Sequence, residues 1–111
     1  HRIQGISDEF IPKLVDLAVL DEIVDVDDGE AIAMTRRLAF ELGLGLGISS
    51  GANFLGALKL SLLQGAGAMT ATVFADCSKK YLSTDLCAEN APEAQGLAAE
   101  VELLEWRALA C

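Results

Sequence analysis

The feature that most constrains the fold is a run of alternating glycines over residues 44–51, which reads LGLGISSG. Glycine in a helix interior costs about 1 kcal/mol relative to alanine, so a continuous helix through this run is disfavoured. The run also breaks the most apolar window of the chain, residues 42–63, and leaves no stretch of about 18 apolar residues to cross a membrane. We therefore expect a short strand at residues 44–48, a tight turn at residues 47–51, and a helix after it.

Residue spacing and end signals predict the neighbouring elements. β-branched residues at 22–26 (EIVDV) and at 70–74 (TATVF) indicate two more strands. Asp27 followed by Glu30 has capping-box spacing, and Gly43 is typical of a helix end, so a helix is expected over 28–42. Apolar periodicity predicts further helices to about residue 63 and over 97–109. This alternation predicts an α/β fold, as part of a mainly parallel sheet flanked by helices.

Composition limits the classes of function. The length of 111 residues suits one domain, and an apolar content of 52% supports a buried core. Eight basic and seventeen acidic residues give a net charge of −9, which argues against binding to nucleic acid or to an anionic membrane surface. No signal-peptide pattern is visible, and Cys77, Cys87 and Cys111 lack C-x-x-C spacing. We expect a cytoplasmic protein with reduced thiols and no metal site.

Residues 47–51 (GISSG) form the candidate ligand site. The glycines allow close approach to the backbone, Ser49 and Ser50 carry hydroxyls, and the N-terminus of a helix follows. A polar or anionic ligand group suits this turn, although serines that only cap the helix would give the same pattern. The run matches the G-x-S-x-G nucleophile motif, but the single histidine, His1, precedes the serines, which argues against a hydrolase. The glycine spacing also departs from the dinucleotide-binding fingerprint.

Four segments together resemble the cysteine synthases, or O-acetylserine sulfhydrylases. They are residues 1–12 (HRIQGISDEFIP), 27–38 (DDGEAIAMTRRL), 47–60 (GISSGANFLGALKL) and 81–84 (YLST), in the order seen in that family. The family belongs to the fold-type II pyridoxal-phosphate enzymes, alongside cystathionine β-synthase. The resemblance implies that residues 1–87 are the C-terminal part of a catalytic region. Residues 88–96 then read as a linker and 97–111 as a C-terminal helical tail.

The resemblance also implies a chemistry and its residues. The intact enzyme would use pyridoxal 5'-phosphate to make L-cysteine from O-acetylserine and sulfide, and it would be a homodimer. Ser49 would form a hydrogen bond with the pyridine nitrogen of the cofactor, and Gly5 would lie beside the amino-acid substrate. None of the four lysines, which are Lys13, Lys59, Lys79 and Lys80, matches the family's Schiff-base lysine. The chain alone is therefore expected to be inactive without the rest of the enzyme.

Departures from the family's sequence pattern leave alternatives open. Residues 7–9 (SDE) replace the small residues usual after Gly5, and residues 75–80 (ADCSKK) replace a proline- and glycine-containing turn of the family. The change at residues 7–9, together with the missing Schiff-base lysine, favours a second hypothesis, a non-catalytic binding or scaffolding α/β module. The change at residues 75–80 affects the packing expected behind the cofactor ring. Cystathionine β-synthase-type activity of the intact protein is a third. The segment after residue 88 lies beyond the resemblance, and it is expected either to pack back on the domain or to join a dimer partner.

Overall fold

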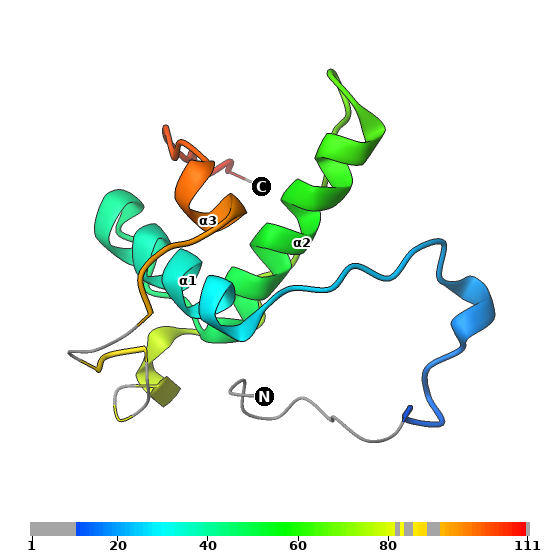
Figure 1. Cartoon of the computed structure of the whole chain (residues 1–111), viewed down its shortest axis with the longest axis horizontal. Coiled ribbons are helices and arrows are strands. Elements are labelled where there is room, and N and C mark those ends of the chain that lie inside the picture. The colour runs from blue at the N-terminus through cyan, green and yellow to red at the C-terminus, as the bar shows by residue number, and fades with distance from the viewer. Residues whose placement is uncertain (1–10, 82, 84–85, 89–91, 111) are drawn as a thin grey trace.

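The computed structural model describes residues 11–81, 83, 86–88 and 92–110. Its elements, in chain order, are η1 (Leu17–Val19), α1 (Asp28–Leu42), α2 (Ile48–Gln64), η2 (Ser78–Tyr81) and α3 (Leu97–Glu100). The two long helices α1 and α2 pack together, and the short α3 lies against α1 (Figure 1). Within this described part, no helix is both long and apolar enough to span a membrane.

The bounds of α1 confirm the helix expected over residues 28–42. Asp27 is the N-cap, and its Oδ1 accepts hydrogen bonds from the backbone N–H groups of Gly29 (2.8 Å) and Glu30 (3.2 Å). Gly43 ends the helix in the left-handed conformation, with φ of 70°. The Glu30 side chain does not complete a capping box with Asp27, because its Oε1 accepts a hydrogen bond from the backbone of Leu97 in α3.

The core lies where α1 and α2 cross. Gly51 makes a close approach possible, since a Cβ at this position would overlap Thr35 Oγ1 and the carbonyl oxygen of Ala31. Thr35 uses its hydroxyl to bond that same carbonyl at 2.8 Å, so the buried polar group is satisfied. The largest apolar side chains that are fully buried come from both helices and are Ile32, Met34, Leu38, Ile48 and Leu55.

The predicted parallel sheet is not confirmed. In the described residues, the segments 22–26 and 70–74 are extended but form no β-ladder, and residues 44–48 contribute only an isolated antiparallel bridge between Leu46 and Cys77. A strand is stabilised by a neighbour that pairs with its backbone. Here side chains of α2 bind those backbone groups instead, as when Lys59 Nζ donates to Asp25 O (2.9 Å) and Asn53 Nδ2 to Val73 O (2.9 Å).

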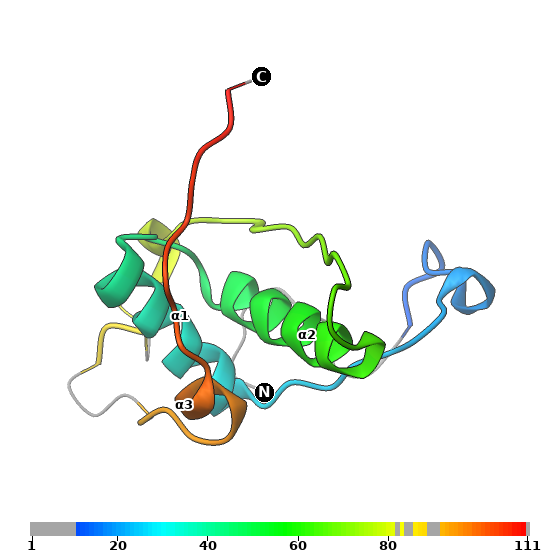
Figure 2. The same cartoon turned by 90° about the horizontal axis from the view of Figure 1, so that it is seen from above.

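The C-terminal helix is much shorter than the periodicity predicts. α3 covers only Leu97–Glu100, and residues 101–110 are not helical. The Arg37 guanidinium donates hydrogen bonds to the carbonyl oxygens of Ala98 (2.7 Å) and Val101 (2.8 Å). Because Ala98 O would otherwise accept the next helical hydrogen bond, these contacts end α3. Beyond α3 the chain passes α1, where Trp106 Nε1 donates to Leu42 O at 2.9 Å, and then leaves the helices (Figure 2).

Candidate functional site

Ser49 lies in the first turn of α2, which begins one residue earlier, at Ile48. The N-cap is Gly47, so neither Ser49 nor Ser50 caps the helix, and the cap-only interpretation of these serines is wrong. The half-buried Ser49 hydroxyl instead donates a hydrogen bond to Asp76 Oδ1 at 3.1 Å. The helix also begins earlier than the sequence predicts, because Ile48 and the two serines form its first turn instead of a strand end.

Asp76 joins Ser49 to a second hydroxyl. Tyr81 donates from its phenol to Asp76 Oδ2 at 2.6 Å, and the Tyr81 ring is buried in the core beside Ile32 and Ile48. Each carboxylate oxygen therefore holds one hydroxyl. The three residues form a continuous polar chain, Tyr81–Asp76–Ser49, which we call the hydroxyl–carboxylate triad.

Backbone pairing brings Asp76 to the start of α2. Gly47 N–H donates to Asp76 O (3.0 Å), and Ser78 N–H donates to Gly45 O (3.0 Å), on either side of the bridge between Leu46 and Cys77. Gly47 is required at this point, because a Cβ there would overlap both the Asp76 carboxylate and the Tyr81 ring. The alternating glycines thus serve a close approach between two distant parts of the chain.

The electrostatics of the triad are dominated by the Asp76 carboxylate. Its hydrogen bond from the Tyr81 phenol, followed by burial of the ring and by the nearby negative charge, raises the pKa of Tyr81 to about 12. The carboxylate also places a negative charge beside the N-terminal end of α2, where an anionic ligand would otherwise be favoured. The turn consequently suits a neutral or cationic ligand group better than the anionic group considered from sequence.

Ser50 is separated from this surface. Its side chain is fully buried, and its Oγ approaches only the backbone oxygen of Asp76, at 3.5 Å. A hydrogen bond of that length is weak. Ser50 therefore contributes to packing at the start of α2, and Ser49 carries the hydroxyl that a ligand could reach.

The other candidate residues from sequence are placed as follows. Gly5 lies outside the described residues. Lys59 is held in the structure by Asp25 O (2.9 Å) and by an ion pair with Glu30 Oε2 (3.7 Å), which supports a structural role. Lys13, Lys79 and Lys80 are exposed. In the described part of the chain, no group of three His, Cys, Asp or Glu side chains is placed to hold a metal ion.

Sequence reasoning missed the roles of Asp76 and Tyr81. In the sequence analysis Asp76 appears only within the segment ADCSKK and Tyr81 only within YLST. The pairing with Ser49, 27 positions earlier, has no local signature.

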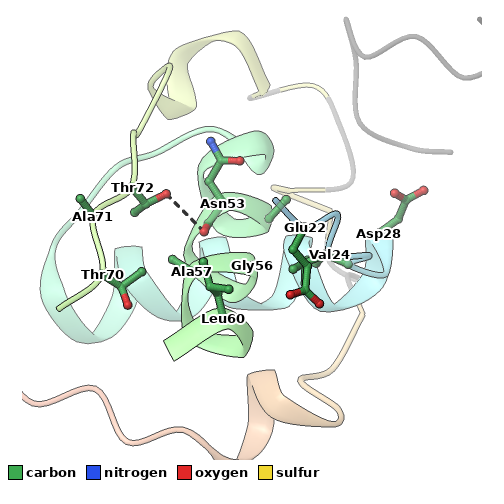
Figure 3. A pocket seen from close by; sticks show the side chains of 12 residues that line it. Glu22, Val24, Asp28, Asn53, Gly56, Ala57, Leu60, Thr70, Ala71 and Thr72 are labelled. Carbon is green, nitrogen blue, oxygen red and sulfur yellow. Dashed lines mark hydrogen bonds between the residues drawn. The ribbon is translucent and has the colours of Figure 1, made fainter. Parts of the chain in front are cut away.

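A groove of about 480 Å³ lies elsewhere, along α2. In Figure 3 residues of α2 form its floor, with the extended segments before α1 and after α2 on its two sides. Thr72 Oγ1 donates across one side to Asn53 O at 3.3 Å. Ser49 is not among the residues that line this groove, which are Glu22, Val24, Val26, Asp28, Ala52, Asn53, Gly56, Ala57, Leu60, Thr70, Ala71 and Thr72.

The Ser49 region fits one end of a pyridoxal-phosphate site. A pyridine nitrogen takes a single hydrogen bond: unprotonated, it accepts from a hydroxyl O–H, and protonated, it donates to a hydroxyl lone pair. The half-buried Ser49 hydroxyl can serve as either partner. The described residues supply neither a lysine at this hydroxyl nor a turn dedicated to phosphate. The fit is therefore limited to the ring-nitrogen end of the cofactor.

Curated relatives match most of this chain. The chain is 42% identical to the cysteine synthase of Haemophilus influenzae over 87 residues, which cover 78% of this chain and 28% of that protein. It is 37% identical to the O-ureido-L-serine synthase of Streptomyces lavendulae over 86 residues, or 78% of this chain and 26% of that protein. No protein-family model matches.

Solved structures give a higher identity. The hydrogen sulfide-producing enzyme of Fusobacterium nucleatum is 62% identical with a TM-score of 0.75, covering 80% of this chain and 26% of that one. A variant of a hydrogen sulfide-producing enzyme with an α-aminoacrylate intermediate is 55% identical with a TM-score of 0.78, over 87% of this chain and 28% of that one. The chain thus spans little more than a quarter of the length of the proteins it matches.

Proposed function

We propose that this chain, which resembles the cysteine synthases over about 78% of its length, is the C-terminal part of a pyridoxal-phosphate-dependent β-replacement enzyme. The reaction proposed for the intact enzyme is the synthesis of L-cysteine from O-acetylserine and sulfide. The observation that carries the proposal is the half-buried Ser49 hydroxyl, presented at the start of α2 within the GISSG run and held by Asp76.

Exposed apolar surface supports the idea that further chain packs here. Leu63 near the end of α2 is 69% exposed, and it lines one hollow together with Val19 (72% exposed) and Leu20 (45% exposed) of the N-terminal segment. Apolar side chains gathered on one surface are typical of contact sites. Within the described residues, the extended segments beside the groove belong to no β-ladder, so strands of further chain could pair with them. We propose that the rest of the enzyme covers this surface, and that a homodimer in the cytoplasm is the working form.

The mechanism of this part concerns the ring nitrogen. When bound, pyridoxal phosphate supplies a conjugated ring that withdraws electrons from the α-carbon of the amino-acid substrate. Ser49 would hold the ring nitrogen through a neutral hydroxyl, which favours an unprotonated nitrogen and a moderate electron sink. Such a sink suits loss of a leaving group from the β-carbon and addition of a sulfur nucleophile. Gly5 is proposed to allow close approach of the substrate.

A second candidate is release of hydrogen sulfide from cysteine. The identity of 55–62% to hydrogen sulfide-producing enzymes, compared with 42% to a cysteine synthase, favours it specifically. In both reactions a group leaves the β-carbon and a nucleophile takes its place. Sulfide is the nucleophile in cysteine synthesis, whereas in its release from cysteine sulfide is the leaving group and water or another nucleophile replaces it. The Ser49 contact with the ring nitrogen serves both.

The test uses the protein joined to the upstream part that carries a lysine for the cofactor. Three assays compare cysteine formation from O-acetylserine and sulfide, sulfide release from cysteine, and cystathionine formation with homocysteine. The Ser49→Ala variant should shift the absorbance of the bound cofactor and lower turnover about tenfold or more, whereas Ser61→Ala on the same helix should do neither. Absence of all three activities in a protein with bound cofactor would favour the non-catalytic module.

A further inference from the structure

We propose that Asp76 is a positioning residue for Ser49: anchored by Tyr81, its carboxylate fixes the direction of the Ser49 hydroxyl at the place where the cofactor's ring nitrogen is proposed to bind. This inference rests on the proposed function and extends it to a residue that has no direct contact with the ring. It assigns a role to the carboxylate that accepts the Ser49 hydrogen bond.

The two hydrogen bonds of Asp76 are unequal. The bond from Tyr81 (2.6 Å) has the short length of an O–H···O⁻ bond to a charged acceptor, whereas the bond from Ser49 (3.1 Å) is longer than the usual range for hydroxyl donors. Tyr81 therefore fixes the carboxylate, and Ser49 is the weaker partner. Because Ser49 has one hydroxyl proton, a ring nitrogen that accepts it replaces Asp76 as the acceptor, while the Tyr81 bond keeps the carboxylate beside Ser49.

The surroundings prevent Asp76 from turning elsewhere. Its backbone oxygen is bound by Gly47 N–H (3.0 Å), and its carboxylate packs over the Gly47 Cα, where no Cβ could fit. The Tyr81 ring fills the other side of the same space and is only 4% exposed. The direction of the Ser49 hydroxyl is thus set by a chain of contacts that ends in the core.

A cofactor-free measurement tests the triad by itself. The 111-residue chain contains one tyrosine, so the absorbance of tyrosinate reports Tyr81 alone. We expect a midpoint near pH 12 in the wild-type chain and a fall toward about 10 in Asp76→Asn, because the acceptor loses its negative charge. The matched control Asp21→Asn, at an exposed position, should leave the midpoint unchanged. Circular dichroism at each pH records loss of helix separately. A wild-type midpoint near 10 would overturn the triad.

A double-mutant cycle in the cofactor-loaded enzyme tests the positioning role. Asp76→Asn should lower turnover about tenfold and shift the pH profile of cofactor absorbance in the same sense as Ser49→Ala. In the Ser49→Ala background, Asp76→Asn should change turnover by less than about twofold and should leave the pH profile of cofactor absorbance in place, because the hydroxyl through which Asp76 acts is gone. A purely structural role predicts a full effect in both backgrounds.

The two proposals fail in different ways. If Ser49→Ala leaves cofactor absorbance and turnover unchanged, the proposed role of Ser49 is wrong whatever Tyr81 does. If Ser49→Ala has its expected effect but Asp76→Asn acts equally strongly without Ser49, the proposed function stands and the positioning role of Asp76 is wrong. Asp76→Glu keeps the negative charge but lengthens the side chain. Compared with Asp76→Asn, it should recover most of the high titration midpoint of Tyr81 but less of the turnover.

Discussion

Glu30 on α1 accepts a hydrogen bond from the backbone N–H of Leu97, the first residue of α3, at 3.1 Å. One face of α1 thereby binds both ends of the short helix, since Arg37 donates to the carbonyl oxygens of Ala98 and Val101 at its other end. Between these two contacts Ala98 is fully buried. A four-residue helix is stable here only because its terminal groups are satisfied from outside.

Replacement of Arg37 should release α3 from α1. Arg37→Gln loses the two charged hydrogen bonds to backbone carbonyls, and we expect the free energy of unfolding to fall by about 1–3 kcal/mol. Urea denaturation measures the change. Arg107→Gln is the matched control, because Arg107 bonds only the exposed Glu105, and it should cost less than about 0.5 kcal/mol. Equal losses in the two variants would contradict the role of Arg37.

The single tryptophan reports the same detachment. Trp106 follows α3 and donates to Leu42 O, and its side chain is 54% exposed. In Arg37→Gln the emission of Trp106 should move to longer wavelength at a urea concentration where α1 and α2 remain helical by circular dichroism. In Arg107→Gln the emission should stay at the wild-type wavelength. A red shift that coincides with loss of all helix would show that the tail does not detach separately.

Stability should fall at alkaline pH because of Tyr81. Its folded-state pKa of about 12 lies above the ordinary value of 10, so the stabilising contribution is fully present below pH 10 and is lost as the pH rises toward 12. The urea midpoint of the wild-type chain should therefore drop over this range. In Tyr81→Phe the drop should be smaller, although the variant starts from a lower stability. A parallel pH dependence in both proteins would exclude Tyr81 as its source.

Two glycines of α2 should respond oppositely to alanine. A Cβ at Gly51 overlaps Ala31 O and Thr35 Oγ1, so Gly51→Ala should force α1 and α2 apart and cost about 1–3 kcal/mol or more. At Gly56 the nearest atom to a Cβ is Val26 Cγ2, at 4.0 Å, and Gly56→Ala should stabilise the helix by about 0.5–1 kcal/mol. Thermal unfolding of both variants tests the pair. Destabilisation by both would contradict the prediction that a Cβ at Gly56 meets no close atom.

The sequence predicted best where local chemistry decides the structure. Asp27 and Gly43 marked both ends of α1, because capping is a short-range interaction between a side chain or a glycine and the adjacent helix. The glycine run does precede a helix, as expected, but the tight turn predicted at residues 47–51 is wrong, because Ser49 lies in the first turn of α2. The expected strand is reduced to one bridge at Leu46. The start of α2 was placed too late, since glycine spacing suggested an extended segment where helical bonds had already begun.

The remaining differences depend on contacts distant in sequence. The apolar periodicity of residues 97–109 is genuine, but Arg37 binds the carbonyls that would continue the helix after Glu100. The runs at 22–26 and 70–74 have strand composition, yet a strand needs a partner, and the described residues provide side chains of α2 in its place. Pairing of Asp76 with Ser49 depends on both the bridge at Cys77 and the space left by Gly47. None of these contacts is encoded within one segment.

The short connection between α1 and α2 has a consequence for the order of folding. Residues 43–47 are all that separate the two helices, so their mutual contacts close a small loop and can form quickly as the chain emerges during synthesis. The extended segments on either side of α2 reach their final structure more slowly than the two helices, because their backbones must first meet a partner strand. Until it does, these segments are open edges that can recruit other extended chains, and a separately expressed copy would be most prone to aggregate through them.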